Sequence, residues 1–264
     1  MVVWLILISL VNQLTEDIDG DYKIIYSGAA PAETLYTDQL ENAYFVDGHK
    51  LIKISVSTGE RIEYGSLSAG RISSADVSNP FQLLIFYRDF NQVVFLNNKL
   101  STIQPPVNLS EVDIEQAALV CSSGRGGFWV YNDLGNRLVY FDRQLRNTNQ
   151  SMVITSITGS GQIPVFMSEV HSHVYLNISG YGILVFDRFA SLIKTIPYSG
   201  PDRFQVIGGK IVYFLNGELY SLDTETHEIM KHDLPPGIKA DNAQLQSKGI
   251  FILSDGTLNY FRTK

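Results

Sequence analysis

The sequence predicts an all-β protein built from six repeated units, and three observations support this prediction. The chain contains 14 Tyr, 14 Phe and 21 Gly, a balance of aromatic strand formers and turn residues that favours strands over helices. Short apolar runs are bounded by turn residues about every 8–12 positions, which is typical of all-β domains. Finally, segments like GFWVYNDLGNRLVYFDRQL, at 127–145, occur six times along the chain.

The six segments share one pattern: an apolar run, a tight turn, a second apolar run and a polar turn. Their turns are marked by Gly48, Phe90, Gly135, Gly180, Gly217 and Gly256, at successive spacings of 42, 45, 45, 37 and 39 residues. A period of about 40–50 residues matches one four-stranded propeller blade. A hairpin cannot bury both of its faces alone, whereas blades stacked around an axis bury one another. The sequence therefore predicts a six-bladed β-propeller with four-stranded antiparallel blades, in preference to five or seven blades.

Each hairpin needs two flanking strands to complete its blade. Innermost strands are expected in the second to sixth repeats at 71–78, 115–123, 164–170, 203–208 and 243–247. Outer strands are expected at 61–66, 150–158, 192–199 and 228–234.

The two ends of the repeat array predict how the ring closes. The sixth repeat stops at Lys264, directly after its third strand, and the segment DYKIIYSG at 21–28 is a lone strand before the first repeat. An N-terminal strand that completes the last blade explains both features and removes the exposed edges that an open sheet would leave. We expect residues 21–264 to form a single propeller domain.

Two segments, LIKISVSTGERIEY and LYSLDTETHEIMKH, resemble the third and fourth strands of pyrroloquinoline-quinone-type or NHL-like propeller repeats. The resemblance covers two of the six repeats and identifies no specific family. The tryptophans that dock neighbouring blades in the quinone enzymes have no counterpart, because the chain has only Trp4 and Trp129, and those enzymes usually have eight blades. The resemblance thus supports a propeller without the quinone cofactor. The chain is similar in kind to exported six-bladed propellers, of which some are lactonases or other hydrolases and many only bind.

The charge of the chain disfavours nucleic acid as a partner. The formal net charge is −7, the sequence pI is near 5.2 and no run of Lys or Arg occurs, whereas binding to a phosphate backbone needs clustered cations. The lone Cys121 forms no internal disulfide, and its apolar surroundings predict a buried structural thiol.

The segment at 1–20 is predicted to be an export signal. Its apolar run, Val2 to Val11, is far shorter than the roughly 20 residues of a membrane span and matches the core of a signal peptide. A basic residue before the run and a small-x-small cleavage site after it are missing, so a buried first strand or short helix is the alternative. Export predicts a periplasmic or envelope-associated protein with no transmembrane span.

Acidic residues near the propeller axis are the candidate metal ligands. Glu169 lies in a predicted innermost strand, and Glu111 and Asp113 lie in a loop that leads into one. Carboxylates converging on one axial ion would suit Ca²⁺, which prefers several oxygen ligands. The competing interpretation is that these strand-end and loop acids are simply solvated. His171 and His173 have no identifiable third ligand, and the sequence contains no Gly-x-Ser-x-Gly motif.

Exposed cations and aromatic residues are the candidate partner contacts. These are Arg71 and Arg203 in loops that lead into innermost strands, and Tyr131 and Tyr181 in the third and fourth repeats. A clear repeat without a matching catalytic pattern predicts a non-enzymatic propeller that binds a protein or glycan partner through one face of the ring. The alternative is a Ca²⁺-dependent, lactonase-like hydrolase with its site on the axis. A third hypothesis is a fixed subunit of an envelope assembly.

Overall fold

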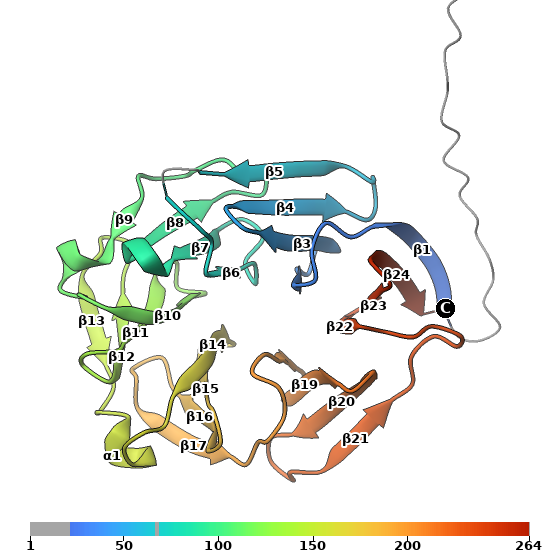
Figure 1. Cartoon of the computed structure of the whole chain (residues 1–264). Helices are drawn as coiled ribbons and strands as arrows, with labels where there is room; N and C mark the ends of the chain where they lie inside the picture. Colours follow the sequence, from blue (N-terminus) through green and yellow to red (C-terminus); the bar gives the residue numbers. More distant parts are fainter. Residues whose placement is uncertain (1–21, 67–68, 264) are drawn as a thin grey trace, which may run out of the picture.

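The computed structural model describes residues 22–66 and 69–263 of the chain. Within these ranges, 24 strands form six four-stranded antiparallel sheets arranged as a ring, the six-bladed β-propeller that the repeats predict (Figure 1). No helix in these ranges is long and apolar enough to cross a membrane. The predicted export segment at 1–20 lies outside the described residues.

The blades follow one another along the chain, and the strands of the first five are numbered from the axis outward. The first blade comprises β2 (Leu35–Thr37), β3 (Asn42–Asp47), β4 (Lys50–Ser55) and β5 (Arg61–Gly65), and the second comprises β6 (Ser74–Asp76), β7 (Leu83–Tyr87), β8 (Gln92–Leu96) and β9 (Val107–Asn108). The third comprises β10 (Ala117–Ser122), β11 (Phe128–Asn132), β12 (Arg137–Phe141) and β13 (Asn147–Gln150), and the fourth comprises β14 (Pro164–Val170), β15 (His173–Ile178), β16 (Gly182–Phe186) and β17 (Leu192–Ile196). The fifth comprises β18 (Gln205–Ile207), β19 (Lys210–Leu215), β20 (Glu218–Asp223) and β21 (Ile229–His232). The sixth blade comprises β22 (Asn242–Gln246), β23 (Gly249–Ser254), β24 (Thr257–Thr263) and, outermost, β1 (Tyr22–Ala29). The short helices are η1 (Arg88–Phe90), η2 (Leu109–Val112) and α1 (Thr155–Thr158).

The predicted innermost strands all exist, but one predicted outer strand is wrong. The outer strand of the third blade is Asn147–Gln150, and the predicted range 150–158 contains α1 instead. Asn136 explains the difference, because its carbonyl and side-chain oxygens accept the backbone N–H groups of Ile154 and Thr155, each at 2.7 Å. These bonds hold the β-branched segment at 153–158 against the third blade, where Ile154 is buried.

Apolar residues on both faces of each blade hold the ring together. In β11, Phe128 and Val130 pack against the second blade, whereas Trp129 and Tyr131 pack against the fourth. Successive strand residues point to opposite faces, so a blade buried on both sides requires a continuous apolar run. Six buried clusters result, one between each pair of neighbouring blades.

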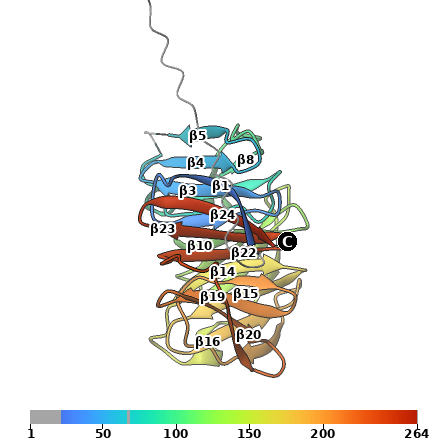
Figure 2. The same ribbon diagram turned by 90° about the vertical axis from the view of Figure 1, so that its right-hand side faces the viewer.

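The ring closes as the sequence predicts. β1 pairs antiparallel with β24 from Tyr22↔Thr263 to Ala29↔Thr257, with an irregularity between Ile24 and Tyr26. Figure 2 views the ring from this side, with β1 beside β24. The last blade is thereby made from both ends of the described chain, and β1 covers the outer edge of β24, the third strand of the blade.

The polar turns of the repeats are side-chain-capped loops between the third and fourth strands. Asn97, Asp142 and Asp187 each occupy the first position, and each side-chain oxygen accepts the N–H groups two and four residues later. The residue at the fourth position is left-handed in every case, with φ between 57° and 68°. Asn and Asp favour such turns because they bond nearby backbone, which explains the polar residues after the hairpins of the second, third and fourth blades.

A variant lacking residues 1–29 tests the closure of the ring. Removing β1 exposes the edge of β24 and deletes the packing of Ile25 and Tyr26 against the first blade. We expect the midpoint of thermal unfolding to fall by more than about 10 °C, measured by circular dichroism. The control lacks only residues 1–20, and equal midpoints for the two variants would contradict closure by β1.

Candidate functional site

The order of strands divides the connections between two faces of the ring. The turns between second and third strands and the connections between blades lie on one face, here called the turn face. The loops between first and second strands and between third and fourth strands lie on the other, here called the loop face. A site is therefore assigned to a face by the connection that carries it.

Side chains connect the innermost strands of neighbouring blades around the channel. Innermost strands have no ladder partner on their axial edge, so their backbone groups need other partners. Gln205 donates to the Leu245 carbonyl at 3.0 Å and accepts the Leu245 N–H at 2.9 Å. In the same way, Gln244 donates to the Leu35 carbonyl at 2.7 Å. Amide side chains therefore hold the fifth, sixth and first blades in register.

A cation lies at the channel mouth on the turn face. The guanidinium carbon of Arg203, from the fifth blade, lies 4.2 Å from the ring centre of Tyr36 in the first blade. It also lies 5.6 Å from the ring centre of Phe166 in the fourth blade. Arg203 thus spans non-adjacent blades through cation–π contacts. A positive charge at this point disfavours a second cation beside it on the axis.

Glu169 connects two blades. One carboxylate oxygen accepts the N–H of Gly124 at 2.9 Å, and the other accepts the indole N–H of Trp129 at 2.6 Å. Both donors belong to the third blade, whereas Glu169 lies near the carboxyl end of β14 in the fourth. Both oxygens of the best sequence-predicted metal ligand are therefore engaged by protein donors.

The structure does not bring Glu169 together with Glu111 and Asp113. Glu111 lies in η2, and Asp113 ends η2 in the left-handed region, with φ 64°. Both precede the amino end of β10 and so belong to the turn face, whereas Glu169 contacts the loop that follows the carboxyl end of β10. Among the described residues, no group of three or more His, Cys, Asp or Glu side chains is positioned to hold a metal ion.

The predicted partner contacts have separate locations. Arg71 is exposed on the turn face. Tyr131 is 0% exposed, and burial raises the pKa of its hydroxyl to about 12, so it cannot contact a partner. Tyr181 lines a cleft of about 260 Å³ between the fourth and fifth blades, together with Tyr198 and Tyr213.

The three remaining sequence candidates are a buried cysteine and two exposed histidines at a turn. Cys121 is fully buried between the third and fourth blades, and burial raises the pKa of its thiol well above the usual value. This agrees with the structural role that the sequence predicts. His171 and His173 are exposed at the β14–β15 turn, where a ring nitrogen of His173 lies 3.0 Å from the His171 carbonyl oxygen.

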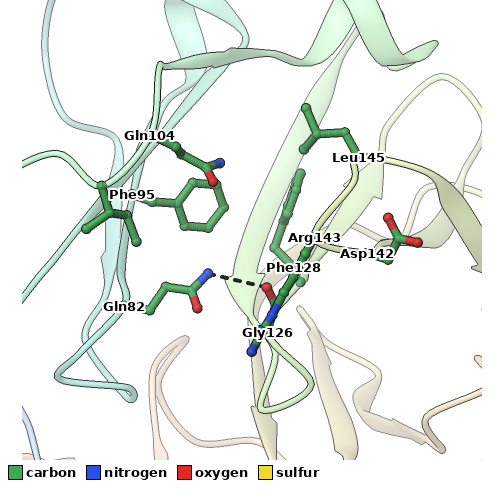
Figure 3. A pocket seen from close by; sticks show the side chains of 10 residues that line it. Gln82, Phe95, Gln104, Gly126, Phe128, Asp142, Arg143 and Leu145 are labelled. Atoms are coloured by element: carbon green, nitrogen blue, oxygen red, sulfur yellow. Dashed lines mark hydrogen bonds between the residues drawn. The ribbon is translucent and has the colours of Figure 1, made fainter.

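A second cleft, of about 310 Å³, opens on the loop face between the second and third blades. Its apolar lining includes Phe95, Phe128 and Leu145, and Gln82 contributes an amide (Figure 3). The amide of Gln82 donates across the gap to the Gly126 carbonyl at 3.4 Å. The other residues that line it are Ile103, Gln104, Gly127, Asp142 and Arg143.

The two charged residues that line this cleft differ in their partners: Asp142 forms an ion pair, and Arg143 does not. Arg146 pairs with Asp142 at 2.7 Å and lowers the pKa of that carboxyl group. Arg143, one residue along, is exposed and forms no ion pair or hydrogen bond within the described part of the chain. Its side chain lies over Gly126, where an added Cβ would stand 2.1 Å from Nε of Arg143. Gly126 therefore provides the space that lets the free guanidinium line the cleft.

Sequence reasoning missed this cleft because its parts come from two blades. Gln82 follows the turn SNPF at 78–81, and Arg143 follows the capping Asp142 in the repeated polar loop. The sequence predicts the loops themselves. No short motif predicts that loops of the second and third blades lie on either side of one cleft.

Comparison with protein-family models finds no match, and no curated protein matches the sequence. Solved structures are similar in fold. Virginiamycin B lyase from Staphylococcus aureus superposes with a TM-score of 0.59 at 10% identity, over 92% of this chain and 100% of that one. The Neurospora crassa Pan2 WD40 domain gives 0.56 at 9% identity, over 92% and 95%. YCF48 bound to D1 peptide gives 0.52 at 9% identity, over 93% and 98%. At these identities the likeness shows the propeller fold alone.

Replacing Glu169 with alanine separates its connecting role from metal binding. The change leaves the N–H groups of Gly124 and Trp129 without their acceptor, so we expect the free energy of unfolding to fall by about 1–3 kcal/mol. Denaturant titration with Trp fluorescence should give the same loss in EDTA and in excess Ca²⁺. Glu115→Ala, an exposed acid on the turn face, is the control. Stabilisation of the unaltered protein by Ca²⁺, absent from Glu169→Ala, would instead identify a metal ligand.

Proposed function

We propose that this propeller is a non-enzymatic binding protein that recognises a partner protein through its loop face. One observation carries the proposal: exposed apolar side chains border a cleft on that face. Ile103 lines the cleft and is 46% exposed, and Phe81, 62% exposed, precedes Gln82 in its wall. Exposed apolar groups next to a cleft with a few polar groups are typical of binding sites.

The turn face is less suited to apolar docking. Apolar side chains are exposed there as well, including Phe90 and Leu134, but each follows or adjoins an acid in its turn, Asp89 and Asp133 respectively. The acids on the described turns and connections of that face are Glu33, Asp47, Asp89, Glu111, Asp113, Glu115, Asp133, Asp202, Asp233, Asp241 and Asp255. Burying charged groups without partners is costly, so this face favours contact with water.

A protein partner fits the structure better than a glycan. The tyrosine cleft is the place where sugar stacking would be expected, yet two of its three tyrosine rings pack against each other. Tyr198 and Tyr213 pack edge to face at 5.4 Å, and Tyr213 is only 9% exposed. These rings present little flat surface to a sugar, whereas the loop-face cleft combines amides and apolar groups that suit a polypeptide.

A Ca²⁺-dependent hydrolase is the alternative that the sequence raises. Such a site needs six to eight oxygen ligands, but Glu169 is engaged by the third blade and is separated from Glu111 and Asp113. The cation of Arg203 at the channel mouth adds a like charge. Binding is the function that this arrangement supports better.

The structural neighbours are compatible with both classes of function. Virginiamycin B lyase is an enzyme by name, whereas the YCF48 structure holds a bound peptide. A propeller of this size can therefore present a peptide site, which is the kind of site proposed here.

The proposal is tested with two matched double variants. Phe81→Ser with Ile103→Ser removes the apolar border of the loop-face cleft, and Phe90→Ser with Leu134→Ser makes the same chemical change on the turn face. Because interface energy concentrates in a few apolar anchors, we expect the loop-face variant to lose at least about tenfold in affinity for proteins that the unaltered propeller retains. The measurement is affinity capture from the native cell extract followed by titration of the retained protein. Loss of binding in the turn-face variant alone would contradict the proposal.

We also propose that the protein is exported and works in the cell envelope. The support is the apolar run Val2 to Val11, which has the length of a signal core. We expect the tagged full chain to be found outside the cytosol with its first residues removed, at a position about 15–30 residues from the start. Cell fractionation with mass spectrometry of the N-terminus measures both. A cytosolic protein that retains residues 1–20 would contradict export.

A further inference from the structure

We propose that the loop-face cleft binds a polypeptide segment in which a carboxylate is adjacent to an apolar side chain, with Arg143 as the anion contact. This assignment rests on the proposed function and specifies its ligand chemistry.

The cleft as a whole has room for one large side chain. Its volume is about 310 Å³, and Phe95 and Phe128, at 2% and 1% exposure, form its inner lining. The two rings pack edge to face at 5.6 Å and lie almost entirely beneath the surface of the cleft. The amides of Gln82 and Gln104 line the same space and can bond the backbone of an extended segment.

The cation of the cleft has no counter-charge of its own. Asp142 is the acid in the lining, and its oxygens accept the guanidinium of Arg146 and the N–H groups of Gln144 and Arg146. All the N–H donors of the Arg143 guanidinium are therefore available to a ligand. Guanidinium groups bind carboxylates through two parallel hydrogen bonds, which suits one acidic group placed at the edge of an apolar pocket.

A second guanidinium, that of Arg125, lies on the other side of the third blade, over Trp129 and Tyr140, and does not line the cleft. Arg125 stacks on the ring of Tyr140 at 3.8 Å, and its Nε and Nη2 atoms are buried without a hydrogen-bond partner. Glu169, which also contacts this loop, is engaged by Gly124 and Trp129. In a chain with a formal net charge of −7, Arg143 is a cation in the cleft lining without an ion pair among the described residues, and this indicates an anionic ligand.

A carboxylate fits better than a phosphate. Arg143 is the one cation in the cleft lining, whereas phosphate recognition draws on several cations or a cradle of backbone N–H groups. The carboxylate can come from a chain terminus, where it is bonded to the Cα of the apolar residue, or from the side chain of an adjoining Asp or Glu, where it lies several bonds further away.

The test uses two pairs of small probes on the whole protein. N-acetylphenylalanine carries a terminal carboxylate, and its uncharged control is N-acetylphenylalanine amide. Acetyl-Phe-Glu-amide carries a side-chain carboxylate, and its control is acetyl-Phe-Gln-amide. We expect at least one acid to bind on the order of tenfold more tightly than its amide, with an affinity that falls as salt is added. Saturation-transfer nuclear magnetic resonance gives the dissociation constants, and the acid that binds identifies the source.

Arg143→Gln is expected to reduce the affinity for the acid to that of its amide, with no change for the amide. Arg188→Gln is the matched control, because Arg188 follows Asp187 in the equivalent loop of the next blade and does not line the cleft. Equal binding of acid and amide, or no effect of Arg143→Gln, would overturn the carboxylate assignment. If the capture experiment still depends on Phe81 and Ile103 in that case, the loop-face function holds and only the ligand chemistry is wrong.

Discussion

The pairing of β1 with β24 is the constraint on which the rest of the structure depends. Every blade is apolar on both faces, so each needs two neighbours, and only a closed ring gives every blade two. The last blade has three strands at the C-terminal end of the chain and receives its fourth from the N-terminal end. Glu41 of the first blade adds to this closure by accepting hydrogen bonds from Tyr260 at 2.9 Å and Arg262 at 2.7 Å.

Closure also determines where binding groups can lie. Apolar contacts fill the spaces between blades, and amides and a guanidinium bridge the channel. Chemistry is thus left to the connections, which the capped loops hold in fixed positions. Asp142 illustrates this: its side chain orders the loop, its charge is satisfied by Arg146, and the neighbouring Arg143 remains free to face the cleft. Stability and recognition are served by adjacent residues of one repeated turn.

The sequence predicts the repeating parts of this structure and not the contacts between repeats. The period of the hairpins and the innermost strand at 164–170 follow from alternation and turn chemistry, and the closure by the segment predicted at 21–28 follows from the missing fourth strand of the last repeat. The strand predicted at 150–158 was wrong because Asn136, a residue of an earlier turn, captures that segment. Tyr131 as a partner contact was wrong because strand alternation directs it into the fourth blade. The role of Glu169 and the loop-face cleft both depend on contacts between two blades. A local sequence pattern cannot predict which residues of the adjacent blade lie opposite.

The most direct test of this account is a crystal structure of the protein soaked with N-acetylphenylalanine. The account predicts density in the cleft between Gln82 and Arg143, with the phenyl ring against Phe95 and Phe128 and the carboxylate on the guanidinium of Arg143. Density at the channel mouth beside Arg203, or in the tyrosine cleft between the fourth and fifth blades, would contradict it.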